Sequence, residues 1–508
     1  MNKLTTFGKI AITSLIIGAL VLGFSLLKKT GVIGKIAPKE ATEKGKPVDN
    51  KDAIKIGVNT WGGFAGGQYF NEGFTANSNS RFLKEYGFPV EFKVLDDFDA
   101  SRAALKSGEI DLLWATIDAF PTEVEGLKEF QPQVAFQVDW SRGGDAIVVR
   151  RGISTANDLK GKTIGLAPLT PSHTFLLWML EASNLTTKDV QIVEFPNAID
   201  AASAFKAGKV DAAVVWSPDD EACIKAVAGS KVLQSTKNAS RIIADVLFAK
   251  KEFLDNNKEK MQKLYEGWMR GAAELNTSED NKLKAAKILS VGYNIPEGDA
   301  LLAINNTRLS THGDNLQFFG LDPNFKGVTG EQLYTKMSSV YNKLGYTSDK
   351  VPNWRIISNP SFIQATNLSG NENLAEGTKE FTAPTEATKT AEAASSKAVS
   401  VNFRTGEFQL DENTKYIIDK EFADLARGFD NARIRIEGNT DNVGNEASNK
   451  ELSYKRAQSV AAYLQKQYNM PANRFVVVGN GSTKPLADNA TAEGKSKNRR
   501  TDFQFVNE

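Results

Sequence analysis

Short apolar runs alternate with helix-like stretches over much of the chain, and this alternation indicates an α/β fold. Segments with apolar residues at helical spacing separate the runs IKIGVN, EFKVL, IDLLWA, AIVVR, TIGLA, VQIVEF and VDAAVVW. Strands that alternate with helices in this way are typical of largely parallel sheets covered by helices. We therefore predict an α/β domain over residues 53–364.

One pattern occurs twice within this domain. The sequence ALKSGEID at residues 104–111 returns as AFKAGKVD at residues 204–211. Each copy is predicted to end a helix, turn at a glycine and begin a strand. Chance is the alternative explanation, because any helix-to-strand connection favours glycine. A repeat placed once in each half instead predicts two similar lobes, with a ligand held between loops at the carboxyl ends of their strands.

Polar and aromatic residues follow the predicted strands of both lobes. Two glycines after the first strand would let the backbone approach a ligand, and a neighbouring tryptophan offers an aromatic wall. Hydroxyls and carboxylates follow equivalent strands in the two halves, and a polar helix start between them would receive an oxyanion. Core packing by the tryptophan and simple helix capping are the alternatives. The predicted clamp residues are Trp61, Gly62, Gly63, Thr116, Asp118, Thr170, Ser172, Trp216 and Asp219.

Composition argues against metal chemistry, catalysis and nucleic-acid binding. The chain has one cysteine, Cys223, and two histidines, His173 and His312, which leave little for a zinc site. The 62 basic and 61 acidic side chains give a net charge of +1, which does not suit a nucleic-acid binder held by bulk charge. We predict no enzyme activity, no metal, no cofactor and no nucleic-acid partner.

The order of these motifs resembles the nitrate/sulfonate/taurine-type periplasmic solute-binding proteins of ABC importers. The residues that carry the resemblance are WGG at 61–63, ALKSGEIDLLWA at 104–115, DLKGKTIGLA at 158–167 and AFKAGKVDAAVVWSPD at 204–219. The resemblance implies a two-lobed, type II-like periplasmic-binding-protein fold that closes on a small anionic or zwitterionic solute. It also implies delivery of that solute to an ABC permease or a sensing role.

The charge of the solute stays open at this point. A sulfonate, nitrate or taurine is what the resemblance implies, but the carboxylates Asp118, Asp139 and Asp219 equally favour a ligand with an amine. A zwitterion would satisfy both groups of residues.

The last part of the chain predicts a small α+β domain over residues 401–508. The pattern is a strand VNF, an amphipathic helix from Ile418 to Phe429, a strand with Ile434 and Ile436, a second helix, and the strands FVVVG and DFQFV. The apolar face of the second helix contains Ala457, Val460, Ala461, Leu464 and Tyr468.

Polar residues of this domain suit a zwitterionic target. Asn449 and Arg456 lie two helical turns apart on one side of the second helix, and Asp441 lies on the loop before it. The carboxylate would accept from an ammonium and the guanidinium would bind a carboxylate. An internal salt bridge with helix capping is the alternative.

The same residues resemble the OmpA-like peptidoglycan-binding domain. The shared string is T-D-x-x-G, N, L-S, R-A and N-R-R. The resemblance implies that Asp441 and Arg456 hold the diaminopimelate end of a wall peptide, with Asn449 and Arg499 as supporting polar groups. Asn439 departs from the family, which usually carries histidine there, and this implies altered local hydrogen bonding.

Two segments of other character flank the α/β domain. Ile10 to Leu27 contains no charged residue and is long enough to cross a hydrocarbon core of ~30 Å. We predict a cytoplasmic tail and membrane anchor over residues 1–29, with a cleavable signal peptide as the alternative. Residues 30–52 predict a tether, and residues 365–400, which have almost no large apolar side chains, predict a disordered linker.

These parts together predict a single-pass inner-membrane protein with most of the chain in the periplasm. Its partners would be a small solute, peptidoglycan and an ABC permease. The alternative is a structural wall anchor whose clamp is a non-transporting spacer. A flagellar-type stator also joins one span to an OmpA-like domain, but its proton path needs a carboxylate in the membrane, and the apolar segment has none.

Overall fold

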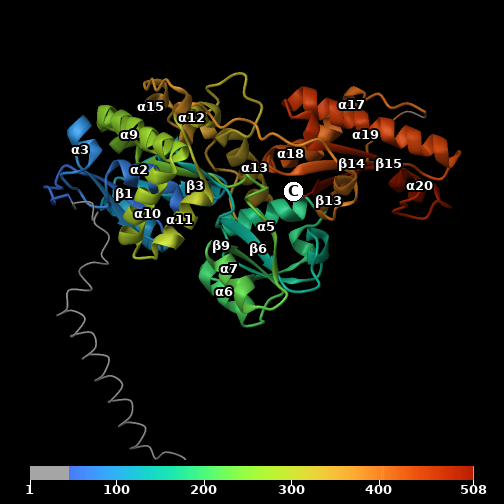
Figure 1. Cartoon of the computed structure of the whole chain (residues 1–508), viewed down its shortest axis with the longest axis horizontal. Helices are drawn as coiled ribbons and strands as arrows, with labels where there is room; N and C mark the ends of the chain where they lie inside the picture. The colour runs from blue at the N-terminus through green and yellow to red at the C-terminus, as the bar shows by residue number, and fades with distance from the viewer. Residues whose placement is uncertain (1–44, 402, 404–405, 507–508) are drawn as a thin grey trace, which may run out of the picture. The chain divides into compact units, whose positions relative to one another are not determined.

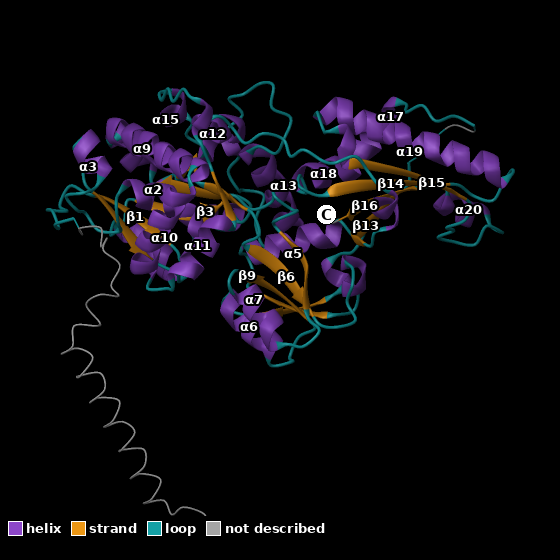
Figure 2. Ribbon diagram, in the orientation of Figure 1, coloured by secondary structure: helices purple, strands orange, loops and turns teal. Residues whose placement is uncertain are grey.

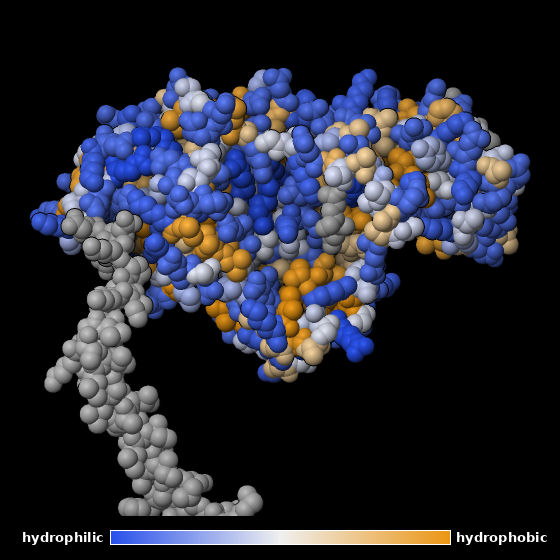
Figure 3. Space-filling model, in the orientation of Figure 1, coloured by the Kyte–Doolittle hydropathy of each residue, from blue (hydrophilic) through white to orange (hydrophobic). Residues whose placement is uncertain are grey.

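The computed structural model describes residues 45–401, 403 and 406–506. Two five-stranded sheets, one two-stranded sheet and one four-stranded sheet organise this part of the chain (Figures 1 and 2). The predicted anchor lies outside the described residues, and within them no helix has both the length and the apolar character needed to span a bilayer. Hydrophilic side chains cover most of the face in Figure 3, as expected for a surface in water.

The first lobe is built on a sheet with the order β2-β1-β3-β11-β4. Strands β1, β2 and β3 are parallel, and β11 runs antiparallel to both β3 and β4. The bounds are β1 (Ile54–Val58), β2 (Val90–Val94), β3 (Leu112–Thr116), β4 (Gln133–Gln137) and β11 (Asp245–Ala249).

The second lobe repeats this arrangement with the order β8-β7-β9-β6-β10. Strand β7 is parallel to β8 and β9, and β6 is antiparallel to β9 and β10. The prediction of two similar lobes is confirmed by this shared strand order. The bounds are β6 (Asp145–Val149), β7 (Thr163–Leu166), β8 (Gln191–Glu194), β9 (Ala212–Trp216) and β10 (Lys231–Ser235).

Strand β9 explains why the apolar runs lack the alternation of a half-exposed strand. Ala213 and Val215 pack in a cluster with Phe205 and Cys223, which belong to α6 (Ala198–Lys206) and α7 (Asp219–Ala226). Val214, on the other face, belongs to the main core with residues of α5 (Pro171–Glu181). Figure 2 shows α5, α6 and α7 around these strands. Both faces are therefore buried, as in a helix-covered parallel sheet.

The sequence repeat corresponds to a structural repeat. Gly108 follows α4 (Phe98–Ser107) with φ of 80°, and Gly208 follows α6 with φ of 79°. A carboxylate then ties each strand entry to the neighbouring strand: Asp111 Oδ2 accepts from the N–H of Lys55 at 2.9 Å, and Asp211 Oδ2 accepts from the N–H of Thr163 at 2.9 Å. The glycine and the aspartate of each copy thus have the same local role.

Helices complete the first lobe and extend beyond residue 250. Helix α2 packs along α9, and α10 packs against α11. The two-stranded sheet pairs β5 with β12. The bounds are α2 (Ala65–Phe70), α3 (Arg81–Tyr86), β5 (Asp139–Ser141), α8 (Lys251–Asn256), α9 (Lys258–Thr277), α10 (Glu279–Tyr293), α11 (Glu297–Asn305), β12 (Thr307–Leu309), α12 (His312–Phe318), α13 (Gly330–Lys343), α14 (Trp354–Ile357) and α15 (Ser361–Gln364).

The C-terminal domain is a four-stranded sheet with the order β13-β16-β14-β15 and helices packed on it. Stacked rings join helix and sheet: Phe422 lies 3.9 Å from Phe503, and Phe429 lies 4.4 Å from Phe505, between ring centroids. The bounds are α16 (Glu386–Thr390), β13 (Ala393–Val399), α17 (Glu412–Ile418), a π-helical turn (Asp419–Ala423), α18 (Asp424–Gly428), β14 (Arg433–Asn439), α19 (Glu446–Tyr468), β15 (Phe475–Gly481), α20 (Ala492–Asn498) and β16 (Thr501–Val506).

The predicted disordered linker over residues 365–400 is wrong for much of its length. Strand β13 occupies residues 393–399 and pairs with β16, so the first strand precedes the predicted VNF. Glu376 bridges Arg142 at 2.5 Å and Arg241 at 2.8 Å. A backbone ladder and ion pairs with distant residues supply the order that this segment's own composition lacks.

Gly438 is required where β14 meets α19. A Cβ built on this residue would lie 2.1 Å from the carbonyl oxygen of Ser453. We expect Gly438→Ala to destabilise the domain by about 1–3 kcal/mol, because backbone must shift to admit the methyl group. Hydrogen–deuterium exchange of β14 and α19 should become faster. Gly298→Ala is the control, since a Cβ there meets nothing within 4 Å; equal exchange in both variants would contradict the packing argument.

Candidate functional site

Four buried aspartates gather where the chain passes between the two lobes. Asp118 follows β3, Asp139 begins β5, Asp145 begins β6 and Asp245 begins β11, and none is more than 4% exposed. Residues 142–144 lead from the first lobe into the second, and β11 returns the chain to the first sheet. The four aspartates therefore lie at the two chain connections between the lobes.

Burial and mutual repulsion make these carboxyl groups hard to ionise. Burial raises the pKa of Asp118 and of Asp145 to about 7, and that of Asp139 to about 6. Burial and the neighbouring Asp139 raise the pKa of Asp245 well above its ordinary value. The site is therefore protonatable near neutral pH.

Three of the aspartates have side-chain donors. The indole N–H of Trp61 donates to Asp139 Oδ2 at 2.8 Å, and the hydroxyl of Ser141 donates to Asp145 Oδ2 at 2.7 Å. Asp118 is fully buried, and the hydrogen bonds that partly offset the effect of burial on its pKa come from the hydroxyls of Thr174 and Thr116 and from the backbone of Asp118 and Ala244. The hydroxyl of Thr174 lowers the pKa of Asp118, but its close contact is with the Tyr341 hydroxyl at 2.9 Å.

The residues predicted after the first strand are packed by the protein itself. Trp61 is 9% exposed, and a Cβ on Gly144 would lie 2.0 Å from its ring. A Cβ on Gly62 would lie 2.2 Å from the Ala303 carbonyl oxygen, and one on Gly63 would lie 1.9 Å from Asp139 Oδ2. These two glycines therefore serve close internal packing, and core packing, the alternative weighed for Trp61, is present.

At the predicted helix start in the second lobe, some polar side chains have hydrogen-bond partners and others have none. Thr170 is the N-cap of α5, but its hydroxyl donates to the Ala167 carbonyl at 2.9 Å. The hydroxyl of Ser172 is fully buried and has no partner among the described residues. His173 Nδ1 accepts from the N–H of Leu169 at 3.3 Å, and burial lowers the pKa of His173 to about 4. The imidazole is thus neutral at pH 7.

The remaining predicted residues lie at the ends of equivalent strands. Thr116 ends β3 and is 4% exposed, whereas Trp216 ends β9 and is partly exposed. The indole nitrogen of Trp216 is buried without a partner among the described residues. Asp219 begins α7, and burial raises its pKa.

The sequence analysis did not identify three residues of the site around the four buried aspartates: Asp145, Asp245 and Thr174. Asp145 and Asp245 each stand directly before an apolar run, which was the available signal. Across the part of the chain that the structure describes, no group of three or more His, Cys, Asp or Glu is arranged to hold a metal ion.

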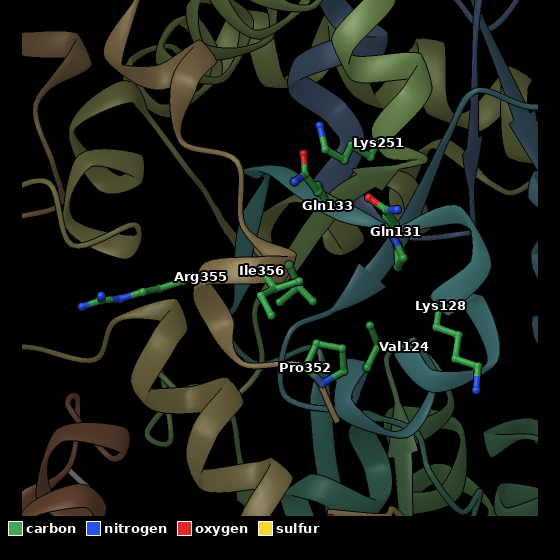
Figure 4. Close-up of a pocket in the computed structure, with 10 residues that line it drawn as sticks. Val124, Lys128, Gln131, Gln133, Lys251, Pro352, Arg355 and Ile356 are labelled. Carbon is green, nitrogen blue, oxygen red and sulfur yellow. The ribbon is translucent and has the colours of Figure 1, made fainter. Parts of the chain in front are cut away.

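Two cavities lie away from the predicted clamp residues. The first has about 330 Å³ and is lined by residues that include Val124, Pro352 and Ile356. In Figure 4 the charged ends of Lys128 and Arg355 point away from this apolar centre. The second, of about 210 Å³, is lined by residues that include Arg241, Glu376 and Tyr468. None of the predicted clamp residues lines either cavity.

The four predicted wall-binding residues lie together in the C-terminal domain. Asp441 Oδ2 pairs with Arg499 Nη1 at 2.7 Å, and Asp441 Oδ1 accepts from the N–H of Val443 at 3.1 Å. Asn449 Nδ2 donates to the Val443 carbonyl at 3.0 Å and thereby fixes the same loop to α19. The direct partner of Asp441 is thus Arg499, which had been predicted only as a supporting group.

Arg456 is buried beside this pair. It is 8% exposed, donates through Nε to the Glu407 carbonyl at 3.0 Å and lies 4.8 Å from the ring of Phe403. Burial and the nearby Arg499 lower its pKa, and Asp441 opposes that effect. Because Arg499 is 49% exposed at its side chain and Asp441 13%, the pair lies at the surface, where a ligand can compete for it.

Asn439 belongs to a separate, buried network. Its side chain donates to Asp502 Oδ2 at 2.9 Å and accepts from Asn480 Nδ2 at 3.1 Å. Glu437 accepts from Asn480 at 2.7 Å and from Lys484 at 2.7 Å. The side chain of Asn439, which the resemblance marks as a departure from the family, therefore lies within a hydrogen-bonded core.

Comparison with protein families assigns the C-terminal part. The model of the OmpA family matches residues 402–499. These residues form an OmpA family domain. The OmpA domain is 37% identical over 106 residues to outer membrane porin F of Pseudomonas aeruginosa, covering 21% of this chain and 30% of the porin. It is 42% identical over 88 residues to the peptidoglycan-binding protein ArfA of Mycobacterium tuberculosis, covering 17% of this chain and 27% of ArfA. The chain thus spans less than a third of the length of these two relatives.

The two-lobed part has its own matches. The NMT1/THI5 like family model matches residues 144–279. The periplasmic aliphatic sulphonate binding protein SsuA from Escherichia coli has a TM-score of 0.48 and 19% identity, over 66% of this chain and 97% of SsuA. The periplasmic nitrate-binding protein NrtA from Synechocystis PCC 6803 has a TM-score of 0.48 and 12% identity, over 63% of this chain and 91% of NrtA. The two family-model matches agree with both resemblances predicted from the sequence.

Proposed function

We propose that this protein is a wall-attached receptor whose two lobes bind a small solute and whose OmpA domain binds peptidoglycan. The observation that carries the proposal is the surface pair of Asp441 and Arg499 beside Arg456, within a domain that matches the OmpA family. A stem peptide with a free ammonium and carboxylate complements these charges. ArfA, a relative of this domain, is described as a peptidoglycan-binding protein.

The solute-binding half of the proposal rests on the fold and its interior. Two lobes of equal strand order are joined by crossing segments. Asp118 lies just after β3 and Ser172 lies in the first turn of α5, the helix after β7, so both buried side chains lie beyond the carboxyl ends of strands, where such folds bind ligands. Sulfonate- and nitrate-binding proteins are among its structural neighbours. The buried aspartates favour a zwitterion over a simple anion such as nitrate.

The cellular arrangement is also a proposal. The apolar segment Ile10–Leu27 supports an inner-membrane anchor with the remaining chain in the periplasm. The solute would then pass to an ABC permease or be reported to a sensor. The binding roles in the names of ArfA and SsuA support a protein that binds ligands and is not an enzyme.

Cosedimentation with purified sacculi tests the wall-binding half. We expect the full chain to sediment with sacculi and to be released by a soluble stem peptide that contains diaminopimelate. The same peptide with its terminal ammonium acetylated and its carboxylate amidated should not release it. Sedimentation that neither peptide affects would contradict a charge-based wall site.

A thermal-shift assay of the full chain across a panel of small solutes tests the solute-binding half of the proposal. If no solute changes the melting temperature, a clamp that serves only as a spacer would be favoured.

A further inference from the structure

We propose that residues 374–379 and the OmpA domain together restrict the opening of the clamp, and that Glu376 is the residue that must be released for the lobes to separate. This segment, the strap, leads from the two-lobed part of the chain toward the OmpA domain. The inference concerns movement of the lobes. It requires neither peptidoglycan nor a solute, so it can fail while the proposed function holds.

Glu376 of the strap ties together the two chain segments that connect the lobes. The chain passes between the lobes at residues 142–144 and again at residues 236–244. Glu376 forms an ion pair with Arg142 of the first connection at 2.5 Å and with Arg241 of the second at 2.8 Å. The two arginine side chains are only 13% and 11% exposed, so these pairs are little screened by water. Because a hinge lies in such connecting segments, one carboxylate holds both sides of the hinge.

The strap is also fixed to the first lobe, at the start of α12. The hydroxyl of Thr311 donates to the Leu374 carbonyl at 2.8 Å, and the N–H of Glu376 donates to Asp314 Oδ1 at 2.8 Å. Helix α12 packs on β4 of the first sheet. The backbone of the strap therefore moves with the first lobe.

The OmpA domain is fixed to the second lobe through β13, the edge strand of its sheet. The side chain of Asn157 donates to the Ser396 carbonyl at 3.3 Å and accepts from the Ser396 N–H at 3.2 Å. Asn184 Nδ2 donates to the Ala398 carbonyl at 3.0 Å. Asn157 and Asn184 both belong to the second lobe, and their amides occupy backbone groups that an edge strand leaves unpaired.

A second contact joins the OmpA domain to the hinge and to the strap. The N–H of Arg241 donates to the Gly428 carbonyl at 3.0 Å. A Cβ built on Gly428 would lie 2.6 Å from the ring of Trp178, on α5 of the second lobe. Lys379 Nζ, at the end of the strap, donates to the Asn431 carbonyl at 2.9 Å. The strap and the second lobe are therefore attached to the same end of the OmpA domain.

These contacts connect the two lobes by a route outside the hinge. The strap is bound to the first lobe and the OmpA domain to the second, so rotation of the lobes about the hinge must break contacts on one side. In this structure the lobes touch each other, because Asn306 Nδ2 after α11 donates to Ser217 Oγ after β9 at 2.9 Å. The strap therefore favours the closed arrangement over an open one.

Pulsed electron paramagnetic resonance on the full chain measures the separation of the lobes. Spin labels would be attached through Asp99→Cys on α4 and Ser203→Cys on α6, two exposed positions in different lobes. The native Cys223 is buried. In this labelled chain, we expect Glu376→Gln to widen the distribution of label distances at least twofold, toward longer distances. The reason is that the amide cannot neutralise the two arginines that face it.

Glu380→Gln is the matched control, since Glu380 is an exposed glutamate four residues later. It should leave the distance distribution unchanged. Because Glu376→Gln leaves two buried cations close together, its folding is checked by circular dichroism, and a second variant leaves the hinge intact. That variant is Asn157→Ala with Asn184→Gly, in which glycine suits the φ of 53° at residue 184.

We expect the asparagine variant to widen the distribution in the same direction, because it releases the OmpA domain from the second lobe. A distribution that either variant leaves unchanged would overturn the inference. Equal widening by Glu380→Gln would overturn it too, because the effect would then not depend on the ion pairs of Glu376. None of these measurements involves sacculi or a solute, so their outcomes are separate from those that test the proposed function.

Discussion

Asp441→Asn is expected to reduce the affinity for sacculi at least tenfold. The substitution keeps the side-chain oxygen that accepts from the N–H of Val443 but removes the charge that pairs with Arg499. A hydrogen bond to a charged group is worth about 1.5–3 kcal/mol, or roughly 10- to 150-fold in affinity. Cosedimentation across a range of sacculus concentrations gives this ratio.

The chain offers a matched control for this variant. Asp488 is exposed and its Oδ1 accepts from the N–H of Ala490 at 2.9 Å, a turn of the same kind. Asp488→Asn should bind sacculi as the unchanged protein does. Arg456→Ala should also lose retention, with its folding checked by circular dichroism because the side chain is buried. Full retention by both Asp441→Asn and Arg456→Ala would exclude this site as the wall contact.

Lowering the pH from 7.5 to 5 is expected to stabilise the ligand-free two-lobed domain. The pKa of Asp118 is raised to about 7 in the folded protein, against about 3.9 in the unfolded chain. The folded state therefore binds more protons between these values, and stability falls as the pH rises from about 4 to about 7. For Asp118 alone, the gain in the free energy of unfolding between pH 7 and pH 5 is about 2 kcal/mol.

Other titratable groups modify this gain. Asp139, Asp145 and Asp245 act in the same direction, although their mutual interaction prevents simple addition. His173 acts in the opposite direction, because its pKa is lowered to about 4 and the unfolded chain takes up a proton below about 6.5. Its cost at pH 5 is about 2 kcal/mol. The aspartates together outweigh it.

Urea denaturation followed by tryptophan fluorescence measures this effect selectively. All seven tryptophans precede residue 365, so their emission reports mainly on the two-lobed domain, although the ring of Trp178 packs against Gly428 and also reports on the contact with the OmpA domain. Asp118→Asn should reduce the difference in unfolding free energy between pH 5 and pH 7.5. Greater stability at pH 7.5 than at pH 5 in the unchanged protein would contradict the electrostatic description of this centre.

The sequence was sufficient for features that local patterns determine. The glycine-and-aspartate repeat has a local cause in each lobe, so Gly108 and Gly208 predicted equivalent turns correctly. The two amphipathic helices of the C-terminal domain were likewise predicted from their apolar spacing. Residues 393–399 were missed because their order comes from pairing with β16, about a hundred residues later in the chain.

The centre between the lobes was only partly predictable for the same reason. Asp118 was identified from its place after a strand, but Asp145 and Asp245 join it through strands β6 and β11, whose neighbours lie in distant parts of the sequence. The donor of Asp139 is Trp61, which the sequence favoured as a ligand contact. These residues show no periodicity in the sequence, because they are brought together by the chain segments that cross between the two lobes.

Because the chain crosses from the first sheet to the second and returns through β11, the two lobes are completed in a fixed order during synthesis. The first sheet includes β11, so β3 and β4 have no strand between them until Asp245–Ala249 has left the ribosome. By then the second sheet, which ends at Ser235, is already complete in sequence. The lobe that begins first is therefore finished last, and a nascent chain stopped before residue 245 would expose two unpaired strand edges.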